Sequence, residues 1–200
     1  TFKVKPSFDG IGKDHDHVRG VKGNFEKLKE TVDRLKEVKK DYPNLYIGLG
    51  TVISKFNIHK IDEISTYAHN WGVDSYINEI AENRTEMYNV NDDITPSGED
   101  YQRIMKMFSD KVRANLKGKS RLIRVMQAFR LVYYELAGQI VKENRQVIPC
   151  YGGITNAHIN AVGDVWPCCV LGYSKPLGNL RDFNYDFKSL WNSTKAGEVR

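Results

Sequence analysis

A nine-residue apolar run, LYIGLGTVI, stands between two segments whose apolar residues recur three and four positions apart. The run covers residues 45–53, and its β-branched residues and glycines are typical of a buried parallel strand. The helical spacing lies in residues 24–40 before the run and in residues 58–71 after it. Further strands are predicted at residues 2–8 and 73–79. Strand and helix therefore alternate, which predicts βαβ units and a parallel sheet.

Single residues mark the expected ends of the helices. Asn24 is the predicted N-cap of the first helix, and Gly72 is predicted to end the second. Beyond the sheet, Ser97 can cap a helix that runs to about Leu116, and a longer helix is predicted from about Ser120 to Asn144. One face of this longer helix is expected to carry an apolar stripe: Leu122, Val125, Met126, Phe129, Val132, Tyr133, Leu136 and Ile140.

The composition of the chain argues against several classes of partner. Hydrophobic residues make up 40% and charged residues 28%, values that are ordinary for a globular protein. The net charge is +5, but basic residues alternate with acidic ones and no Arg-rich stretch is interleaved with aromatics, so no nucleic acid partner is predicted. No run is apolar enough to predict a membrane span. The start, TFKVKPSFDG, lacks the apolar core of a signal peptide, so a cytoplasmic protein is expected, and it resembles a strand entered midway through a longer protein.

The three cysteines, Cys150, Cys168 and Cys169, all lie in the tail that begins at Pro149. An odd number argues against a complete disulfide framework. Gly163-Asp164 stands between two short alternating runs, which predicts a β-hairpin. Such a hairpin could bring Cys150 and Cys168 to one metal ion or cluster, although an iron–sulfur cluster generally takes four such ligands. Buried structural thiols are the open alternative.

Polar residues also follow the first predicted strand, in SFDG (residues 7–10) and HDHVRG (residues 15–20). Loops at the carboxyl ends of parallel strands are where α/β proteins bind ligands. Ser7 and Asp9 can bond a ribose there, and Arg19 can pair with a carboxylate. The alternative is a plain turn with a surface arginine. The DHDH run at residues 14–17 is not predicted to bind metal, because consecutive residues rarely converge on one ion; solvated-loop or helix-capping roles are expected.

Three stretches together resemble radical SAM enzymes that carry a SPASM or twitch auxiliary-cluster domain. They are SFDG…HDHVRG…GNF, TVISKFN (residues 51–57), and the tail with Cys150, INAVGDVWPC, LGNLRDF and LWNS. The resemblance implies an α/β fold: the C-terminal half of a partial (β/α)6 radical SAM barrel over residues 1–90, followed by two helices. These helices form a linking segment at residues 91–144, and the start of a small SPASM/twitch β-hairpin domain is expected at residues 145–200.

The resemblance also implies a chemistry. In this family a [4Fe–4S] cluster held by a CxxxCxxC motif binds S-adenosylmethionine and cleaves it reductively, and the 5′-deoxyadenosyl radical abstracts hydrogen from the substrate. That motif is missing from this sequence, so the chain is expected to be an internal piece of an oxidoreductase and to be inactive alone. A peptide or other small-molecule substrate and a reducing electron donor are the expected partners.

Residue roles are likewise implied by the resemblance, and no catalytic residue is assigned. Ser7 and Asp9 are expected to face the ribose of S-adenosylmethionine and Arg19 its methionine carboxylate, with Asn57 as a further candidate. Cys150 and Cys168 are expected to be ligands of an auxiliary [4Fe–4S] cluster. Cys169 is expected not to bind the cluster if the strand continues through it, because successive side chains of a strand alternate between faces.

Two other functions fit the same residues. One is a non-catalytic iron–sulfur module for redox or partner binding, and the other is an α/β-barrel scaffold with inert cysteines. A CxxxCxxC motif upstream would favour the enzyme over the module. Metal analysis of anaerobically purified full-length protein would identify the inert scaffold.

Overall fold

The structure is a computed structural model of the 200-residue chain and describes residues 2–84 and 87–200. The chain divides into two compact units. The sheet unit comprises Thr1–Ala81 and Ile94–Val147, and the cysteine unit comprises Glu82–Asp93 and Ile148–Arg200. Helices α4 and α5 therefore share a unit with the sheet. The predicted family domains at 1–90, 91–144 and 145–200 stay a prediction.

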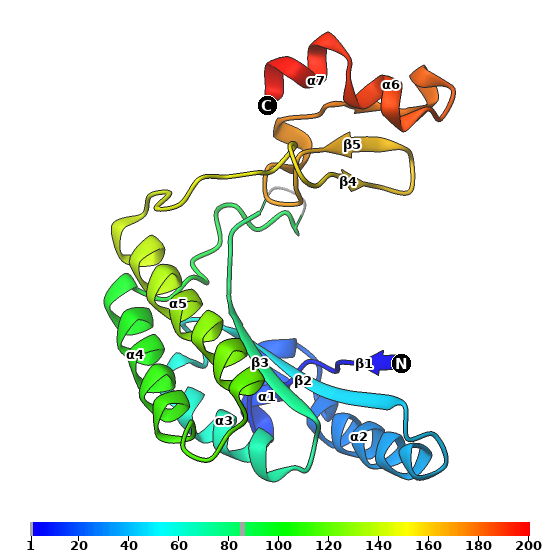
Figure 1. The fold of residues 1–200 in the computed structure, drawn as a ribbon. Helices are drawn as coiled ribbons and strands as arrows, with labels where there is room; N and C mark the ends of the chain where they lie inside the picture. The colour runs from blue at the N-terminus through cyan, green and yellow to red at the C-terminus, as the bar shows by residue number, and fades with distance from the viewer. Residues whose placement is uncertain (1, 85–86) are drawn as a thin grey trace. The chain divides into compact units, whose positions relative to one another are not determined.

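The sheet unit contains three parallel strands, in the order β1-β2-β3 (Figure 1). They are β1 (Phe2–Val4), β2 (Leu45–Ile53) and β3 (Ser75–Ile80), and the prediction of parallel pairing is confirmed. β1 is shorter than predicted because Pro6, which has no N–H to donate, interrupts it. Pairing resumes beyond the proline, where Phe8 N donates to Gly50 O over 2.7 Å.

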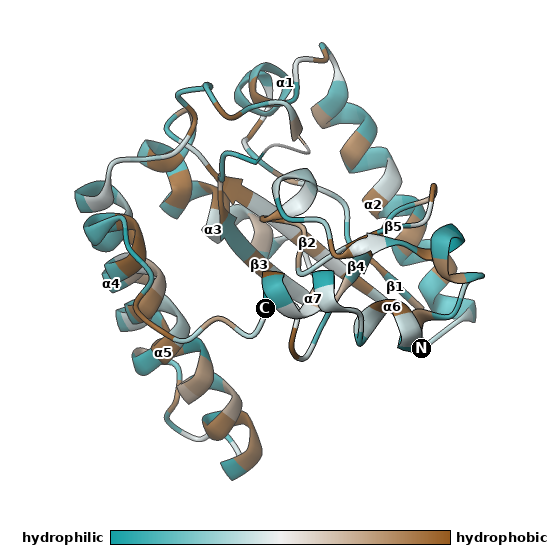
Figure 2. Cartoon of the chain, turned by 90° about the horizontal axis from the view of Figure 1, so that it is seen from above, coloured by the Kyte–Doolittle hydropathy of each residue, from teal (hydrophilic) through white to brown (hydrophobic). Residues whose placement is uncertain are grey.

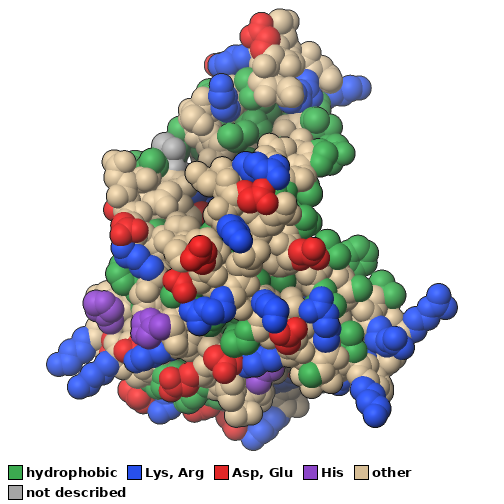
Figure 3. Space-filling model, turned by 90° about the vertical axis from the view of Figure 1, so that its left-hand side faces the viewer, with side chains coloured by type: hydrophobic (Ala, Val, Ile, Leu, Met, Phe, Trp, Pro, Cys, Tyr) green, Lys and Arg blue, Asp and Glu red, His purple; other side chains and the backbone are tan. Residues whose placement is uncertain are grey.

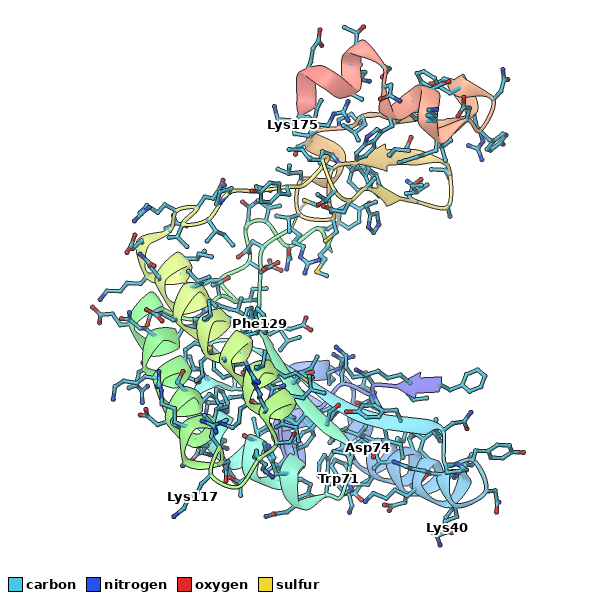
Figure 4. All side chains as sticks on the ribbon, in the orientation of Figure 1. Lys40, Trp71, Asp74, Lys117, Phe129 and Lys175 are labelled. Atoms are coloured by element: carbon cyan, nitrogen blue, oxygen red, sulfur yellow. The ribbon has the colours of Figure 1, made fainter. Side chains whose placement is uncertain are left out.

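Helices connect and follow these strands. The helical segments of the sheet unit are α1 (Lys13–Arg19), α2 (Asn24–Asp41), η1 (Ile58–Lys60), α3 (Ile61–Asn70), α4 (Gly98–Ala114) and α5 (Arg121–Glu143). The core between helices and sheet is a single cluster that includes Phe8, Val32, Leu49, Ile61 and Met105, all at most 2% exposed. In the connection from α3 to β3, Asp74 (labelled in Figure 4) accepts a hydrogen bond from Ile47 N over 2.7 Å, which ties β3 to β2.

The predicted N-cap of α2 is wrong. Asn24 is the first residue of the helix and makes no capping bond there, while Gly23 holds the cap position with φ 77°. The capping acceptor comes instead from α1: Asp16 accepts from Gly23 N over 2.6 Å and from Phe25 N over 2.8 Å. The expectation of a capping role within DHDH is confirmed. So is the N-cap Ser97. The longer helix was predicted to start at about Ser120, and Ser120 caps it.

Helix α5 packs on α4 through a different face from its predicted apolar stripe. Its buried residues are Tyr134 and Gly138, and a Cβ placed on Gly138 would lie 3.6 Å from Gln102 Cα. Phe129 of the stripe is 74% exposed (labelled in Figure 4). Hydrophobic residues occur along the whole of α5 (brown in Figure 2), so periodicity alone does not select the packed face.

The cysteine unit has its own small core, formed by Val165, Leu177, Leu190 and Ala196. Its antiparallel sheet has the order β4-β5-β6, and the turn at Gly163-Asp164 joins β4 to β5. The elements are β4 (His158–Ile159), β5 (Asp164–Trp166), η3 (Gly172–Ser174), β6 (Gly178–Asn179), η4 (Leu180–Phe183), α6 (Phe187–Trp191) and α7 (Thr194–Val199). Across the described parts of both units, no helix combines the length and the apolar character that a membrane crossing requires.

Candidate functional site

Two of the residues predicted to bind S-adenosylmethionine lie together at the carboxyl edge of the sheet. Asp9 is 1% exposed, and its Oδ1 accepts from Val52 N over 2.8 Å. Asn57 is also buried, and its Nδ2 donates to Asp9 O over 3.0 Å and to Val52 O over 2.9 Å. Both side chains are therefore committed to holding the two strand ends at a fixed separation.

The other two predicted residues are more accessible. Ser7 is exposed and its backbone bridges to Gly50. Arg19, at the end of α1, donates from Nη1 to Asp9 Oδ2 over 3.2 Å, and its side chain is 43% exposed. A guanidinium carries five N–H donors, so this ion pair leaves donors available for an anion. Polar groups that a ligand can reach at this edge thus come from Ser7 and Arg19, with Asp9 orienting the arginine.

A buried histidine of helix α1 supports this edge, so the solvated-loop or capping role expected for the DHDH run is wrong for His15. His15 is fully buried; its Nδ1 accepts from Asp9 N over 3.1 Å, and its Nε2 lies 2.8 Å from Asn24 Oδ1. Because the amide can only donate, Nδ1 is unprotonated and the neutral ring donates through Nε2–H. A Cβ on Gly10 would lie 2.6 Å from His15 N, so only glycine fits there. The one feature of the sequence that could have indicated a role for His15 is its position in the HDHVRG stretch, which follows the first strand.

Asp16, next to this histidine, stabilises the start of α2 through its carboxylate. The backbone N–H groups of Phe25 and Gly23 hold the pKa of its carboxyl below the usual 3.8. A carboxylate at a helix N-terminus also interacts favourably with the helix dipole. Two neighbouring residues of α1 therefore stabilise different segments. His15 binds the backbone at Asp9, and Asp16 caps the start of α2.

Cys150 and Cys168, the predicted cluster ligands, lie on either side of Gly152. A Cβ on this glycine would lie 3.4 Å from Cys150 Sγ and 3.7 Å from Cys168 Cβ. Backbone N–H groups point at both sulfurs, from Gly152 to Cys150 and from Leu171 to Cys168, each over 3.4 Å. Hydrogen bonds to sulfur are one way that proteins tune iron–sulfur clusters. The two sulfurs and the backbone donors that point at them fit two ligands of such a cluster.

The backbone before Cys168 is held from two directions. Asn156 Nδ2 donates to Pro167 O over 3.1 Å, and Gly153 N donates to the same oxygen over 3.2 Å. At the far end of the hairpin, Gly163 has φ 89°, and Asn179 Nδ2 donates to Asp164 Oδ1 over 2.8 Å. The asparagine of the LGN stretch therefore closes the hairpin turn.

Cys169 lies near a different partner. Its Sγ is 3.6 Å from Nη1 of Arg84, which belongs to the Glu82–Asp93 segment of the same unit. Within residues 2–84 and 87–200, no group of three or more His, Cys, Asp or Glu side chains is arranged to hold a metal ion. Cys169 as a non-ligand stays a prediction.

The tail matches a known family. Residues 150–200 match the family model of SPASM, an iron–sulfur cluster-binding domain. These residues are similar to a SPASM domain. This domain therefore contains both cysteines that flank Gly152, together with the hairpin and α6. No curated protein matches the sequence.

Solved structures resemble the whole chain. Native anSMEcpe with bound AdoMet has 16% sequence identity and a TM-score of 0.59, over 99% of this chain and 52% of that chain. A histidine-tagged form with bound AdoMet has 17% identity and a TM-score of 0.57, over 99% and 50%. The native form with AdoMet and a Kp18Cys peptide has 17% identity and a TM-score of 0.53, over 99% and 52%. The chain thus spans about half the length of these proteins, and the predicted radical SAM resemblance with a SPASM tail is confirmed at the level of the fold.

Proposed function

We propose that the chain is part of a radical SAM enzyme that uses S-adenosylmethionine and iron–sulfur clusters to act on a peptide. The observation that carries this proposal is the SPASM domain, whose Cys150 and Cys168 flank one glycine and each accept a backbone hydrogen bond. The fold likeness to AdoMet-bound structures, one of which also holds a peptide, supports the choice of cofactor and of substrate class. A reducing electron donor is required by such chemistry.

In this proposal Cys150 and Cys168 are two ligands of an auxiliary [4Fe–4S] cluster, which supplies one-electron chemistry when bound. The N–H groups of Gly152 and Leu171 stabilise negative charge on the two sulfurs. The two hydrogen bonds to Pro167 O hold the Cys168 backbone in place. A Cβ on Gly152 would be in van der Waals contact with Cys150 Sγ and Cys168 Cβ, so a larger side chain there would lie beside both cysteines.

At the carboxyl edge of the sheet, we assign Ser7, Asp9, Arg19 and Asn57 to S-adenosylmethionine. Ser7 and Arg19 present donors to the ligand, Ser7 to the ribose and Arg19 to the methionine carboxylate. Asp9, which is buried, acts indirectly by orienting Arg19 through their ion pair. Asn57 holds the segment after β1 beside the end of β2 through its bonds to Asp9 O and Val52 O.

The cluster assignment is tested by iron content in the anaerobically reconstituted full-length enzyme. Cys168→Ala should lower the iron content by up to one cluster, because a ligand is lost. Cys169→Ala is the matched control and should keep the iron, since its sulfur lies beside Arg84 rather than Gly152. Loss of iron from Cys169→Ala with retention by Cys168→Ala would reverse the assignment. If neither variant loses iron, the proposed cluster site is wrong.

The S-adenosylmethionine assignment is tested by calorimetry on the same enzyme. The double variant Ser7→Ala with Arg19→Ala should weaken binding by about tenfold or more, because a charge-assisted hydrogen bond is lost. Lys22→Ala, an exposed change between α1 and α2, is the control. Circular dichroism should show both variants folded. Unchanged affinity in the double variant would remove these residues from the site.

A further inference from the structure

A cavity of about 480 Å³ lies in the sheet unit between α3, β3, α4 and the first half of α5. This volume is typical of small-molecule sites. Tyr76 and Asn78 of β3 line it. The residues assigned to S-adenosylmethionine (Ser7, Asp9, Arg19 and Asn57) do not line the cavity. The cavity is therefore separate from the proposed S-adenosylmethionine site.

The cavity wall is cationic. Lys111, Lys119 and Arg130 contribute to it, and the described lining includes no Asp or Glu. Lys111 is paired with Asp62. Across residues 2–84 and 87–200, Lys119 and Arg130 form no ion pair. This contrasts with the face shown in Figure 3, where Lys and Arg (blue) are interspersed with Asp and Glu (red). A pocket lined by cations without carboxylates favours an anionic ligand.

Two buried polar atoms in the lining lack hydrogen-bond partners among the described residues: Tyr76 Oη and Gln127 Oε1. Tyr76 is 8% exposed. Burial raises the pKa of Tyr76 to about 12, so the hydroxyl is a neutral donor at physiological pH. Buried polar atoms are nearly always satisfied, and a ligand would satisfy these two.

The remaining wall is aromatic and aliphatic. Phe108 and Tyr134 have ring centroids 5.8 Å apart, and His69 and Tyr76 are 5.6 Å apart. Val112, Leu116 and Ile123 complete this apolar surface. Aromatic and aliphatic walls favour a flat ring, because stacking and apolar burial act together.

We propose that this cavity binds a small aromatic carboxylate that carries an N–H or O–H donor. The carboxylate pairs with Arg130 and Lys119. The ring packs against Phe108, and its donor satisfies Gln127 Oε1. The hydroxyl of Tyr76 donates to an acceptor of the ligand.

The test uses indole-3-acetate as the probe and the 200-residue chain. Calorimetry should show binding of indole-3-acetate at least about tenfold tighter than of indole-3-acetamide, which has the same shape without the charge. Amide resonances of Tyr76, Phe108 and Tyr134 should shift on titration in NMR spectra.

Arg130→Gln should weaken binding of the probe about tenfold, and Tyr76→Phe should weaken it by a smaller factor. Arg124→Gln, an exposed arginine on the same helix, is the matched control and should bind as the unmodified chain does. Equal affinity for the acid and the amide would overturn the proposal. Unchanged affinity of Arg130→Gln for the probe would also overturn it, as would NMR shifts confined to residues outside the cavity. The NMR shifts are measured on the unmodified chain, so this outcome does not depend on whether a variant folds.

Discussion

Asp16 shows how one carboxylate can determine the acid sensitivity of an element. Bonds from Phe25 N and Gly23 N lower its pKa, so the folded state holds the carboxylate more favourably than the unfolded chain does. A group with a depressed pKa stabilises the fold at pH above 3.8, and this stabilisation is lost as the pH falls through the lowered value. We expect Asp16→Asn to lower the urea midpoint at neutral pH and to flatten its fall below about pH 4. Asp33→Asn, at an exposed position of α2, controls for the loss of one charge. An acid profile that Asp16→Asn leaves unchanged would contradict this account.

Among the elements, the limits of β2 and α2 could be predicted because each has one dominant pattern. Residues 45–53 form a continuous apolar run, and α2 has a single apolar stripe. The cap of α2 could not be predicted, because its acceptor, Asp16, comes from a separate helix, which local sequence cannot indicate. The local hairpin signal was enough to predict that Cys150 and Cys168 lie near each other. No local pattern predicts the role of His15, because its two hydrogen bonds depend on tertiary contacts.

Packing of α4 on α5 gives a sharper test at the scale of the element. Gly98 begins α4, and a Cβ there would lie 2.5 Å from Lys142 Cα, a backbone atom that cannot move alone. Gly98→Ala should therefore destabilise the sheet unit by about 1–3 kcal/mol in urea unfolding. Gly197, inside α7, has no atom within 4 Å of the position that a Cβ would take, and Gly197→Ala should instead stabilise the cysteine unit by about 0.5–1 kcal/mol. Equal changes in unfolding free energy for Gly98→Ala and Gly197→Ala would contradict the close approach of Gly98 to Lys142.

For the whole molecule, the division into two units with separate cores predicts separable unfolding. Leu190 is fully buried in the core of the cysteine unit. Leu190→Ala should cost that unit about 2–5 kcal/mol. Hydrogen exchange followed by mass spectrometry should show faster exchange in residues 148–200, while β2 and α2 keep their protection. Loss of protection that spreads equally through β2 would show that the two cores unfold as one.

The cysteine unit is discontinuous, because it draws Glu82–Asp93 from before α4 and Ile148–Arg200 from after α5. A ribosome releases the first of these pieces before it has made either helix, and contacts between segments so distant in sequence form late. Arg84 cannot approach Cys169 until the whole helical pair has been synthesised. During translation the sheet can therefore fold before the cysteines have been synthesised. Of the two units, the cysteine unit folds second.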